Sequence, residues 1–261
     1  MRLRGIPDAD ACRLPCLLDD HRLRNRHLRR CRSNSSLMRR WIFEQSLTLF
    51  FLALFLLSLA GQSVAGFRAY NQEQQAHDEA TIDYGRYLVS SDFGGNVMEN
   101  WQSEFLQFTL IVLATIWLVQ RGSTESKQIN DAGPESDTEA RVGGAAPTAG
   151  PKWAKVRNWR LKIYESSLGL AMLTIFLGAW LAQSLTNWTM FNDEQTQHGE
   201  KAVSWLRYLS QADFWNRTLQ NWQSEFLAVA TMAAFSIYLR QRGSAESKPV
   251  GAPHEETGSS G

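Results

Sequence analysis

Four long apolar stretches constrain the fold of this chain more than any other feature of its sequence. They cover residues 42–65, 101–120, 163–185 and 222–239. A helix of about 20 residues, rising about 1.5 Å per residue, crosses the roughly 30 Å hydrocarbon core of a bilayer. The second and fourth stretches reach this length only if their polar first residues are included. The sequence therefore predicts an all-α membrane protein with four transmembrane helices.

The first stretch also resembles a secretory signal peptide, because Arg39 and Arg40 precede it and residues 63–65 resemble a cleavage site. Its apolar run is longer than that of a usual signal peptide, and a second copy of it occurs in the middle of the chain. We therefore interpret the first stretch as a retained helix.

An internal repeat relates the two halves of the chain. Residues 41–127 align with residues 162–248 at an offset of 121 positions without a gap, and 36 of these 87 positions are identical. The longest shared block, Asn-Trp-Gln-Ser-Glu-Phe-Leu, begins at Asn100 and again at Asn221. Identity at this level indicates a duplication. We expect two tandem two-helix repeats, at residues 38–122 and 159–243.

The remaining segments are polar. We expect residues 123–158 to form a flexible linker and residues 244–261 a disordered tail. The Arg-rich residues 1–37 show no apolar periodicity, which is typical of a disordered basic tail or of a start site assigned upstream of Met38. The alternative is a basic arm attracted to anionic lipid or nucleic acid. We expect no nucleic-acid partner.

All three cysteines lie in the first forty residues. Cys12 and Cys16 have no second pair of cysteines or histidines at zinc spacing, so the sequence predicts no zinc site there. No disulfide is expected beyond Cys31.

Basic residues flank one end of every stretch and so predict the orientation. They are Arg39, Arg40, Arg121, Arg157, Arg160, Lys162, Arg240 and Arg242. The positive-inside rule places both termini and the linker in the cytoplasm. The two repeats then point the same way, related by a pseudo-twofold axis along the membrane normal. Gly122 and Gly243 suit the left-handed position that ends a helix.

Polar residues that recur at the outer ends of the stretches form the candidate outer-face site. They are Gln62, Gln102, Glu104, Gln183, Gln223 and Glu225. An ionisable residue such as Glu104 or Glu225 within a spanning helix is a functional hypothesis by default. The alternative is an interfacial carboxylate favoured by the helix dipole and bonded to Gln62 or Gln183. Asp92 and Asp213 are candidates to cap these helices earlier.

A second candidate site involves two histidines. Glu73 and His77, and Glu194 and His198, are each four residues apart, which places carboxylate and imidazole on one helix face. Two such faces would suit a divalent metal or a pH sensor. The alternative is an ordinary solvated helix surface.

Catalytic motifs are not evident in the sequence. It contains no Gly-rich phosphate loop, no nucleophile elbow and no Cys/His catalytic pair. We therefore predict a protein that is not an enzyme and that needs no cofactor.

Three runs of residues carry a family resemblance: Leu-Ala-Gly-Gln-Ser from Leu59, the paired Asn-Trp-Gln-Ser-Glu-Phe blocks, and Arg-Gln-Arg-Gly-Ser-Ala-Glu-Ser-Lys-Pro from Arg240. From Met38 to its end the chain resembles an uncharacterised bacterial family, domain of unknown function 6766. The resemblance implies a multi-pass membrane location but no activity, ligand or catalytic residue.

The sequence thus predicts a non-enzymatic envelope component of the bacterial inner (plasma) membrane with a polar site at its extracytoplasmic face. One alternative is a small transporter or channel that uses Glu104 and Glu225. A membrane enzyme is the least favoured alternative. The lipid bilayer is the expected partner, while a homo-oligomer and the identity of a small-molecule or ion ligand are left open.

Overall fold

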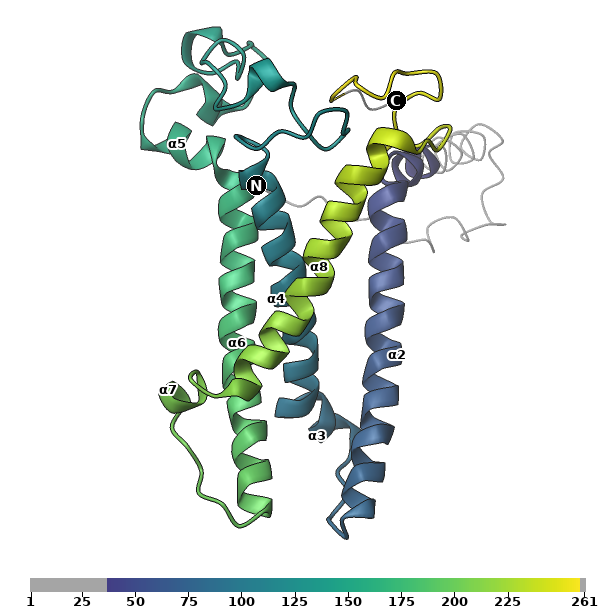
Figure 1. Ribbon diagram of the computed structural model, residues 1–261, viewed down its shortest axis with the longest axis vertical. Helices are drawn as coiled ribbons and strands as arrows, with labels where there is room; N and C mark the ends of the chain where they lie inside the picture. Colours follow the sequence, from purple (N-terminus) through teal and green to yellow (C-terminus); the bar gives the residue numbers. More distant parts are fainter. Residues whose placement is uncertain (1–36, 259–261) are drawn as a thin grey trace, which may run out of the picture. The chain divides into compact units, whose positions relative to one another are not determined.

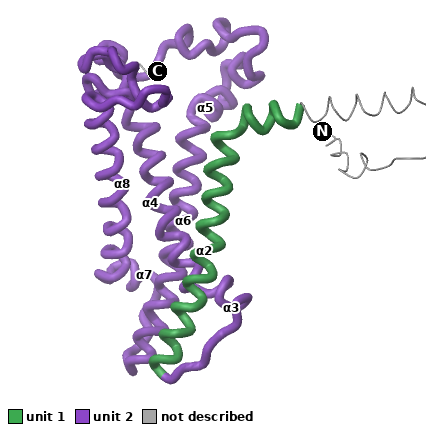
Figure 2. The backbone as a smooth tube through the Cα atoms, turned by 90° about the vertical axis from the view of Figure 1, so that its right-hand side faces the viewer, with its two compact units in different colours: residues 1–77 green, residues 78–261 purple. Residues whose placement is uncertain are grey.

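The computed structural model describes residues 37–258. The expectations for the N-terminal segment and its cysteines therefore lie outside the described residues, apart from position 37. The chain divides into two compact units, residues 1–77 and residues 78–261, which Figure 2 distinguishes by colour. All regular elements between residues 37 and 258 are helical, as predicted, and this part of the chain contains no strand.

Unit 1 consists, in its described part, of helical residues 37–44 and the long helix α2, Ser46–Ala76. The apolar stretch predicted this helix but ended it at residue 65. The helix continues because residues 66–76 are rich in Gln, Glu and Ala, which favour helix even without an apolar pattern. It ends where Asp78 adopts a left-handed backbone with φ of 58°.

Unit 2 is built on three long helices, α4 (Ser91–Ala114), α6 (Ser167–Gln197) and α8 (Ala212–Tyr238). Helix α4 packs against both α6 and α8 (Figure 1). Its shorter helices are α3 (Tyr84–Leu88), η2 (Ile129–Asp131), η3 (Gly143–Ala145), η4 (Lys152–Lys155), α5 (Trp159–Glu165) and α7 (Trp205–Tyr208).

Aromatic side chains hold α6 and α8 together. The ring of Trp180 in α6 stacks on Phe176, with 5.6 Å between centroids, and lies 5.7 Å from Trp222 in α8. Phe214, also in α8, lies 6.1 Å from Trp180 and 5.8 Å from Tyr208. Each such pair contributes about 0.5–1.5 kcal/mol beyond the area it buries.

Helices α4 and α8 both begin about ten residues before the apolar stretches that predicted them. Ser90 caps α4 by accepting a hydrogen bond from the backbone N–H of Phe93 at 3.3 Å, whereas Gln211 makes no side-chain cap for α8. The prediction that Asp92 and Asp213 are the caps is therefore wrong. Asp92 and Asp213 each lie in the first turn of their helix, where the helix dipole stabilises a carboxylate.

The ends of α4 and α8 also differ from the prediction. Both helices end before Gly122 and Gly243, so the expectation that these glycines end the helices is wrong. Their φ angles, 85° and 83°, are left-handed as expected, but the residues lie in later turns. A Cβ on Gly122 would lie 2.3 Å from the backbone oxygen of His254, so this glycine permits a close approach of the C-terminal segment.

Residues 244–258, which we expected to have no fixed structure, form turns around Lys248. Its buried ammonium donates hydrogen bonds to the backbone oxygens of Gly122 at 2.7 Å, His254 at 3.0 Å and Glu256 at 3.1 Å. A buried cation is costly unless it is hydrogen-bonded, and these carbonyls replace its water. They join the C-terminal segment to the chain that follows α4.

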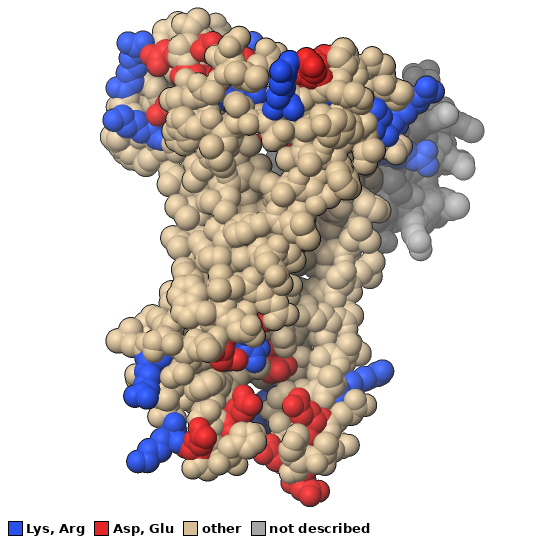
Figure 3. Space-filling model, viewed as in Figure 1, with Lys and Arg blue, Asp and Glu red and all other residues tan. Residues whose placement is uncertain are grey.

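Two described helices, α2 and α6, are long and apolar enough to cross a membrane. In unit 2, residues 105–120, 166–192 and 226–239 contain no Lys, Arg, Asp or Glu. On the face shown in Figure 3, the charged side chains of unit 2 gather at the two ends of its helices. The polar residues that begin α4 and α8 lie beside the second half of α6, and this is where the candidate site lies.

Candidate functional site

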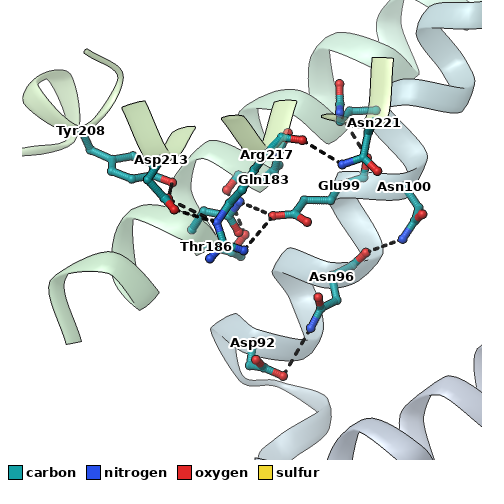
Figure 4. A network of polar contacts seen from close by, with 12 residues as sticks. Asp92, Asn96, Glu99, Asn100, Gln183, Thr186, Tyr208, Asp213, Arg217 and Asn221 are labelled. Carbon is teal, nitrogen blue, oxygen red and sulfur yellow. Dashed lines mark hydrogen bonds and ion pairs between the residues drawn. The ribbon is translucent and has the colours of Figure 1, made fainter. Parts of the chain in front are cut away.

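A group of polar residues lies between the first halves of α4 and α8 and the second half of α6 (Figure 4). We call it the polar cluster. Its members are Glu99 of α4, Gln183 and Asn187 of α6, and Asp213 and Arg217 of α8. Residues four apart share a helix face, so α6 and α8 each direct two members toward the same region.

A glycine allows α4 to approach α6 at this point. A Cβ on Gly95 would lie only 2.6 Å from the side-chain oxygen of Asn187. With no side chain there, Asn187 reaches across and its Nδ2 donates to Oε1 of Glu99 at 2.6 Å. The hydrogen bond fixes Glu99 against α6 one turn beyond Gly95.

Arg217 joins the two carboxylates of the polar cluster. Its Nη1 lies 3.5 Å from Oε1 of Glu99, and its Nε donates to the two carboxylate oxygens of Asp213 at 3.1 and 3.2 Å. The Glu99 side chain is only 15% exposed, against 36% for Arg217 and 33% for Asp213. With two carboxylates and one guanidinium, the cluster has a net charge of −1.

Tyr208 connects the polar cluster to the aromatic core. Its fully buried hydroxyl donates to Oδ2 of Asp213 at 2.9 Å. Burial raises the pKa of Tyr208, and the hydrogen bond and negative charge of Asp213 raise it further. Tyr208 therefore stays protonated and holds Asp213 facing Arg217.

Gln183 differs from the other members because its side chain makes no hydrogen bond. Its side chain is fully buried, and neither Oε1 nor Nε2 has a partner. Oδ1 of Asn187, one turn further along the same face of α6, also lacks a partner. The large majority of buried side-chain polar atoms in proteins are paired, and leaving one unpaired costs about 1–3 kcal/mol. Three such atoms on one helix face call for an explanation.

Gln102 provides a contrast within the same helix bundle. It is as deeply buried as Gln183, but its Oε1 accepts from Nε1 of Trp222 at 2.7 Å and its Nε2 donates to the backbone oxygen of Glu99 at 3.1 Å. Gln102 thus serves packing between α4 and α8.

The other predicted outer-face residues lie apart from the polar cluster or in unit 1. Glu104 and Gln223 are exposed, and Glu225 is half-buried. The carboxylates of Glu104 and Glu225 interact electrostatically. Gln62 is an exposed residue of α2 in unit 1.

The two histidines of the predicted metal site lie at helix ends in separate units. Nδ1 of His77 lies 3.0 Å from the backbone oxygen of Glu73, while the backbone N–H of His198 donates to the backbone oxygen of Glu194 at 3.1 Å. Within residues 37–258, no group of three or more His, Cys, Asp and Glu is placed to hold a metal ion. The metal or pH-sensing role of these pairs stays a prediction.

The sequence analysis did not identify Glu99, Asn187 or Arg217 as site residues. It searched for residues that recur in both repeats, whereas the position equivalent to Glu99 is Gln220 and the one equivalent to Arg217 is Asn96. The signal that could have found them is the reverse of recurrence. Glu99 and Arg217 are residues of opposite charge at positions where the two halves of the sequence differ.

An open groove of about 230 Å³ is lined in part by Ser184 of α6. Its walls are mostly aromatic and aliphatic, including Trp180, Trp205 and Trp215. Nε1 of Trp205 donates to Oγ of Ser184 at 3.2 Å. The groove therefore offers a surface for apolar contacts and no charged group.

Comparison with known proteins gives a family and nothing beyond it. No curated protein and no solved structure shows significant similarity to this chain. A family model described as Domain of unknown function (DUF6766) matches residues 38–259, which is most of the sequence. The resemblance found in the sequence is therefore confirmed, and the chain belongs to the DUF6766 family of domains of unknown function.

Proposed function

We propose that this protein is a four-span, non-enzymatic component of the bacterial inner membrane, made of two tandem two-helix repeats with both termini and the linker in the cytoplasm. Helices α2 and α6 support two of the spans by their length and apolar character. The charge-free residues 105–120 and 226–239 support the other two, with basic residues after each.

Matching hydrogen bonds support the duplication. The hydroxyl of Tyr87 donates to Asp92 at 3.2 Å, as that of Tyr208 does to Asp213 at 2.9 Å. Positions 121 apart thus make the same contact at the start of α4 and of α8. Two separate folds sharing a membrane would have no reason to share this detail.

The function we propose is binding of a small polar ligand or ion at the outer face by the polar cluster. Gln183 lies 16 residues after the start of α6 at Ser167, or about 24 Å along its axis. In the proposed orientation this depth is near the outer edge of a roughly 30 Å hydrocarbon core. The cluster is then reached from outside, where Glu99 is partly exposed.

The unpaired amide of Gln183 carries this proposal. A leucine or methionine of similar size would fill the same space without buried unpaired atoms. Proteins retain destabilising groups mainly at functional sites, where the ligand satisfies them. A binding role explains both the burial of Gln183 and its lack of a partner.

Stability measurements on two leucine variants test this proposal. In purified, detergent-solubilised protein without added ligand, Gln183→Leu should raise the free energy of unfolding by about 1–2 kcal/mol because it removes two unpaired polar atoms. Gln102→Leu is the matched control and should lower it by about 1–3 kcal/mol, because Nε1 of Trp222 loses its acceptor. A loss of stability in both variants would show that Gln183 is structural.

Topology is tested separately by cysteine labelling. After Cys12, Cys16 and Cys31 are changed to serine, single cysteines are introduced as Glu200→Cys and Thr148→Cys. A membrane-impermeant maleimide should label position 200 in intact cells and position 148 only after the membrane is opened. The reverse pattern would contradict the proposed orientation.

One observation favours the alternative of a small transporter or channel. Glu104 and Glu225 hold equivalent positions in the two repeats, and their carboxylates interact electrostatically. Ionisable residues within spanning helices often mark cation or proton paths. The combined variant Glu104→Gln with Glu225→Gln should lose ion flux in proteoliposomes while keeping its melting temperature. Unchanged flux, or flux absent from the unmodified protein, would exclude this alternative.

A further inference from the structure

We propose that the ligand of the polar cluster is a small monovalent cation, Na⁺ or K⁺, held by the side-chain oxygens of Gln183 and Asn187 together with the carboxylate of Glu99. This inference rests on the proposed binding function and names the ligand class of the same site.

The charge distribution favours a cation. Arg217 is directed mainly at Asp213, whose two oxygens lie 3.1 and 3.2 Å from Nε, and it is 3.5 Å from Glu99. Tyr208 also donates to Asp213. Glu99 therefore keeps much of its negative charge although it is largely buried. An anion would be repelled, and a neutral ligand would leave this charge uncompensated.

The available atoms point the same way. Oε1 of Gln183 and Oδ1 of Asn187 are unpaired acceptors one turn apart on α6. Nδ2 of Asn187 donates to Oε1 of Glu99 at 2.6 Å, so the carboxylate lies beside the same amide group. Amide and carboxylate oxygens are the ligands that hard cations prefer. Nε2 of Gln183 is left to donate to a water molecule that accompanies the ion.

The number of carboxylates favours a monovalent ion over a divalent one. Ca²⁺ and Mg²⁺ sites usually contain several carboxylate ligands. Here Glu99 is the one carboxylate bonded to Asn187, because Asp213 faces Arg217 and Tyr208. In the described part of the chain, no group of three or more His, Cys, Asp and Glu side chains is placed to hold a metal ion.

Melting temperatures in different salts test the proposal. The purified protein in detergent is heated in NaCl, KCl or N-methyl-D-glucamine chloride at equal ionic strength, since the last cation is too large for the site. Na⁺ or K⁺ should raise the melting temperature by about 2–4 °C over N-methyl-D-glucamine, in a saturable manner. Equal melting temperatures in the three salts would overturn the inference.

Three variants locate the effect. Gln183→Leu and Glu99→Gln should abolish the salt-specific shift, and the second keeps an acceptor for Asn187 while removing the charge. Gln62→Leu changes the equivalent, exposed position of α2 and should retain the shift in full. A shift that survives Glu99→Gln, or that disappears in Gln62→Leu, would contradict the assignment of the ion to this cluster.

Failure of this inference can be told from failure of the proposed function. If Gln183→Leu is more stable than the unmodified protein but all three salts give one melting temperature, the polar site stands and the cation does not. If Gln183→Leu is less stable, both fall together.

Discussion

Helices α4 and α8 begin with the same hydrogen-bonding framework but carry different charges. Asn100 in α4 and Asn221 in α8 each donate from Nδ2 to the backbone oxygen four residues earlier, at 2.9 Å. The hydroxyl of Ser103 donates in a similar way to the backbone oxygen three residues earlier, at 3.0 Å. These bonds stay within each helix, so the framework shapes the helix start and leaves the charged positions free to differ.

Two of the differences between these helices involve charged residues of the polar cluster. In α4, Nδ2 of the exposed Asn96 donates to Asp92 at 3.4 Å, whereas in α8 the equivalent Arg217 binds Asp213 more closely and also reaches Glu99. Glu99 in turn is equivalent to the exposed Gln220. Each helix thus carries one charge that its counterpart lacks, and the two charges pair with each other. A shared framework serves folding, and the asymmetric pair marks the part that has specialised.

Breaking the charge pair should give the largest effect. Arg217→Met leaves Glu99 and Asp213 partly buried without a countercharge, and we expect the free energy of unfolding to fall by about 2–3 kcal/mol, less than for a fully buried pair because Arg217 is 36% exposed. Denaturant unfolding in detergent measures this. The control Asn96→Met should change stability by no more than about 0.5 kcal/mol.

The double variant Glu99→Gln with Arg217→Asn gives both helices the residues of their counterparts. Because it removes both charges together, it should recover part of the stability lost in Arg217→Met. If Arg217→Met and Asn96→Met cost the same, the pair contributes nothing and the comparison of the two helices loses its meaning.

Adjacent glycines in α4 test the contact with α6. Gly95→Ala should lower stability by about 1–2 kcal/mol, because its Cβ would lie 2.6 Å from Oδ1 of Asn187 and overpack the interface. Gly94→Ala meets only a methyl group of Thr186 at 3.4 Å and should gain up to about 1 kcal/mol from its better helix propensity. Equal responses in thermal unfolding would show that α4 and α6 are not in close contact here.

Alkaline pH should weaken both helix starts. Burial, followed by the charge of Asp92, raises the pKa of Tyr87 to about 12, and burial likewise raises that of Tyr208. A group whose pKa is raised by folding contributes stability that is complete below its unfolded pKa of about 10 and is lost as the pH rises toward the folded value. At pH 11 the loss for Tyr87 is about 1 kcal/mol.

Unfolding measured between pH 9 and pH 11 checks this, with Tyr87→Phe as the variant that removes the titrating group. The variant should be less stable than the unmodified protein at pH 9 but should lose less between pH 9 and pH 11. An identical pH slope in both proteins would show that Tyr87 does not titrate in this range.

The long helices could be predicted from the sequence, but the starts of α4 and α8 could not. Residues 91–100 and 212–221 are mostly polar, and their few apolar residues are too sparse to extend the apolar stretches that predicted the helices. They are helical because of contacts made by single residues, such as the hydroxyls that Tyr87 and Tyr208 direct at the first turns. Contacts of this kind depend on where a preceding segment folds back, which local sequence does not determine.

The polar site was predicted only in part, for a related reason. Gln102 and Gln183 were selected because they recur in both repeats, yet one is fully paired and the other is unpaired. The difference depends on the neighbouring helix, since Trp222 faces Gln102 and no side chain donates to Gln183. Glu99 and Arg217 were missed because recurrence excludes residues that differ between repeats, and asymmetric pairs consist of such residues.

The smallest predicted effect concerns the helix caps, where α4 and α8 differ by one hydrogen bond. Ser90 satisfies the backbone N–H of Phe93, so Ser90→Ala should cost about 0.5–1 kcal/mol, while Gln211→Ala removes no cap and should cost little. The converse variant Gln211→Ser should stabilise α8 by a similar amount, because Gln211 already has the extended backbone that a cap requires. Thermal unfolding of the three variants measures these effects. Should Gln211→Ser fail to stabilise the protein while Ser90→Ala destabilises it, α8 must begin under constraints other than those of α4. The two helix starts would then share a sequence pattern but not the interaction that fixes where the helix begins.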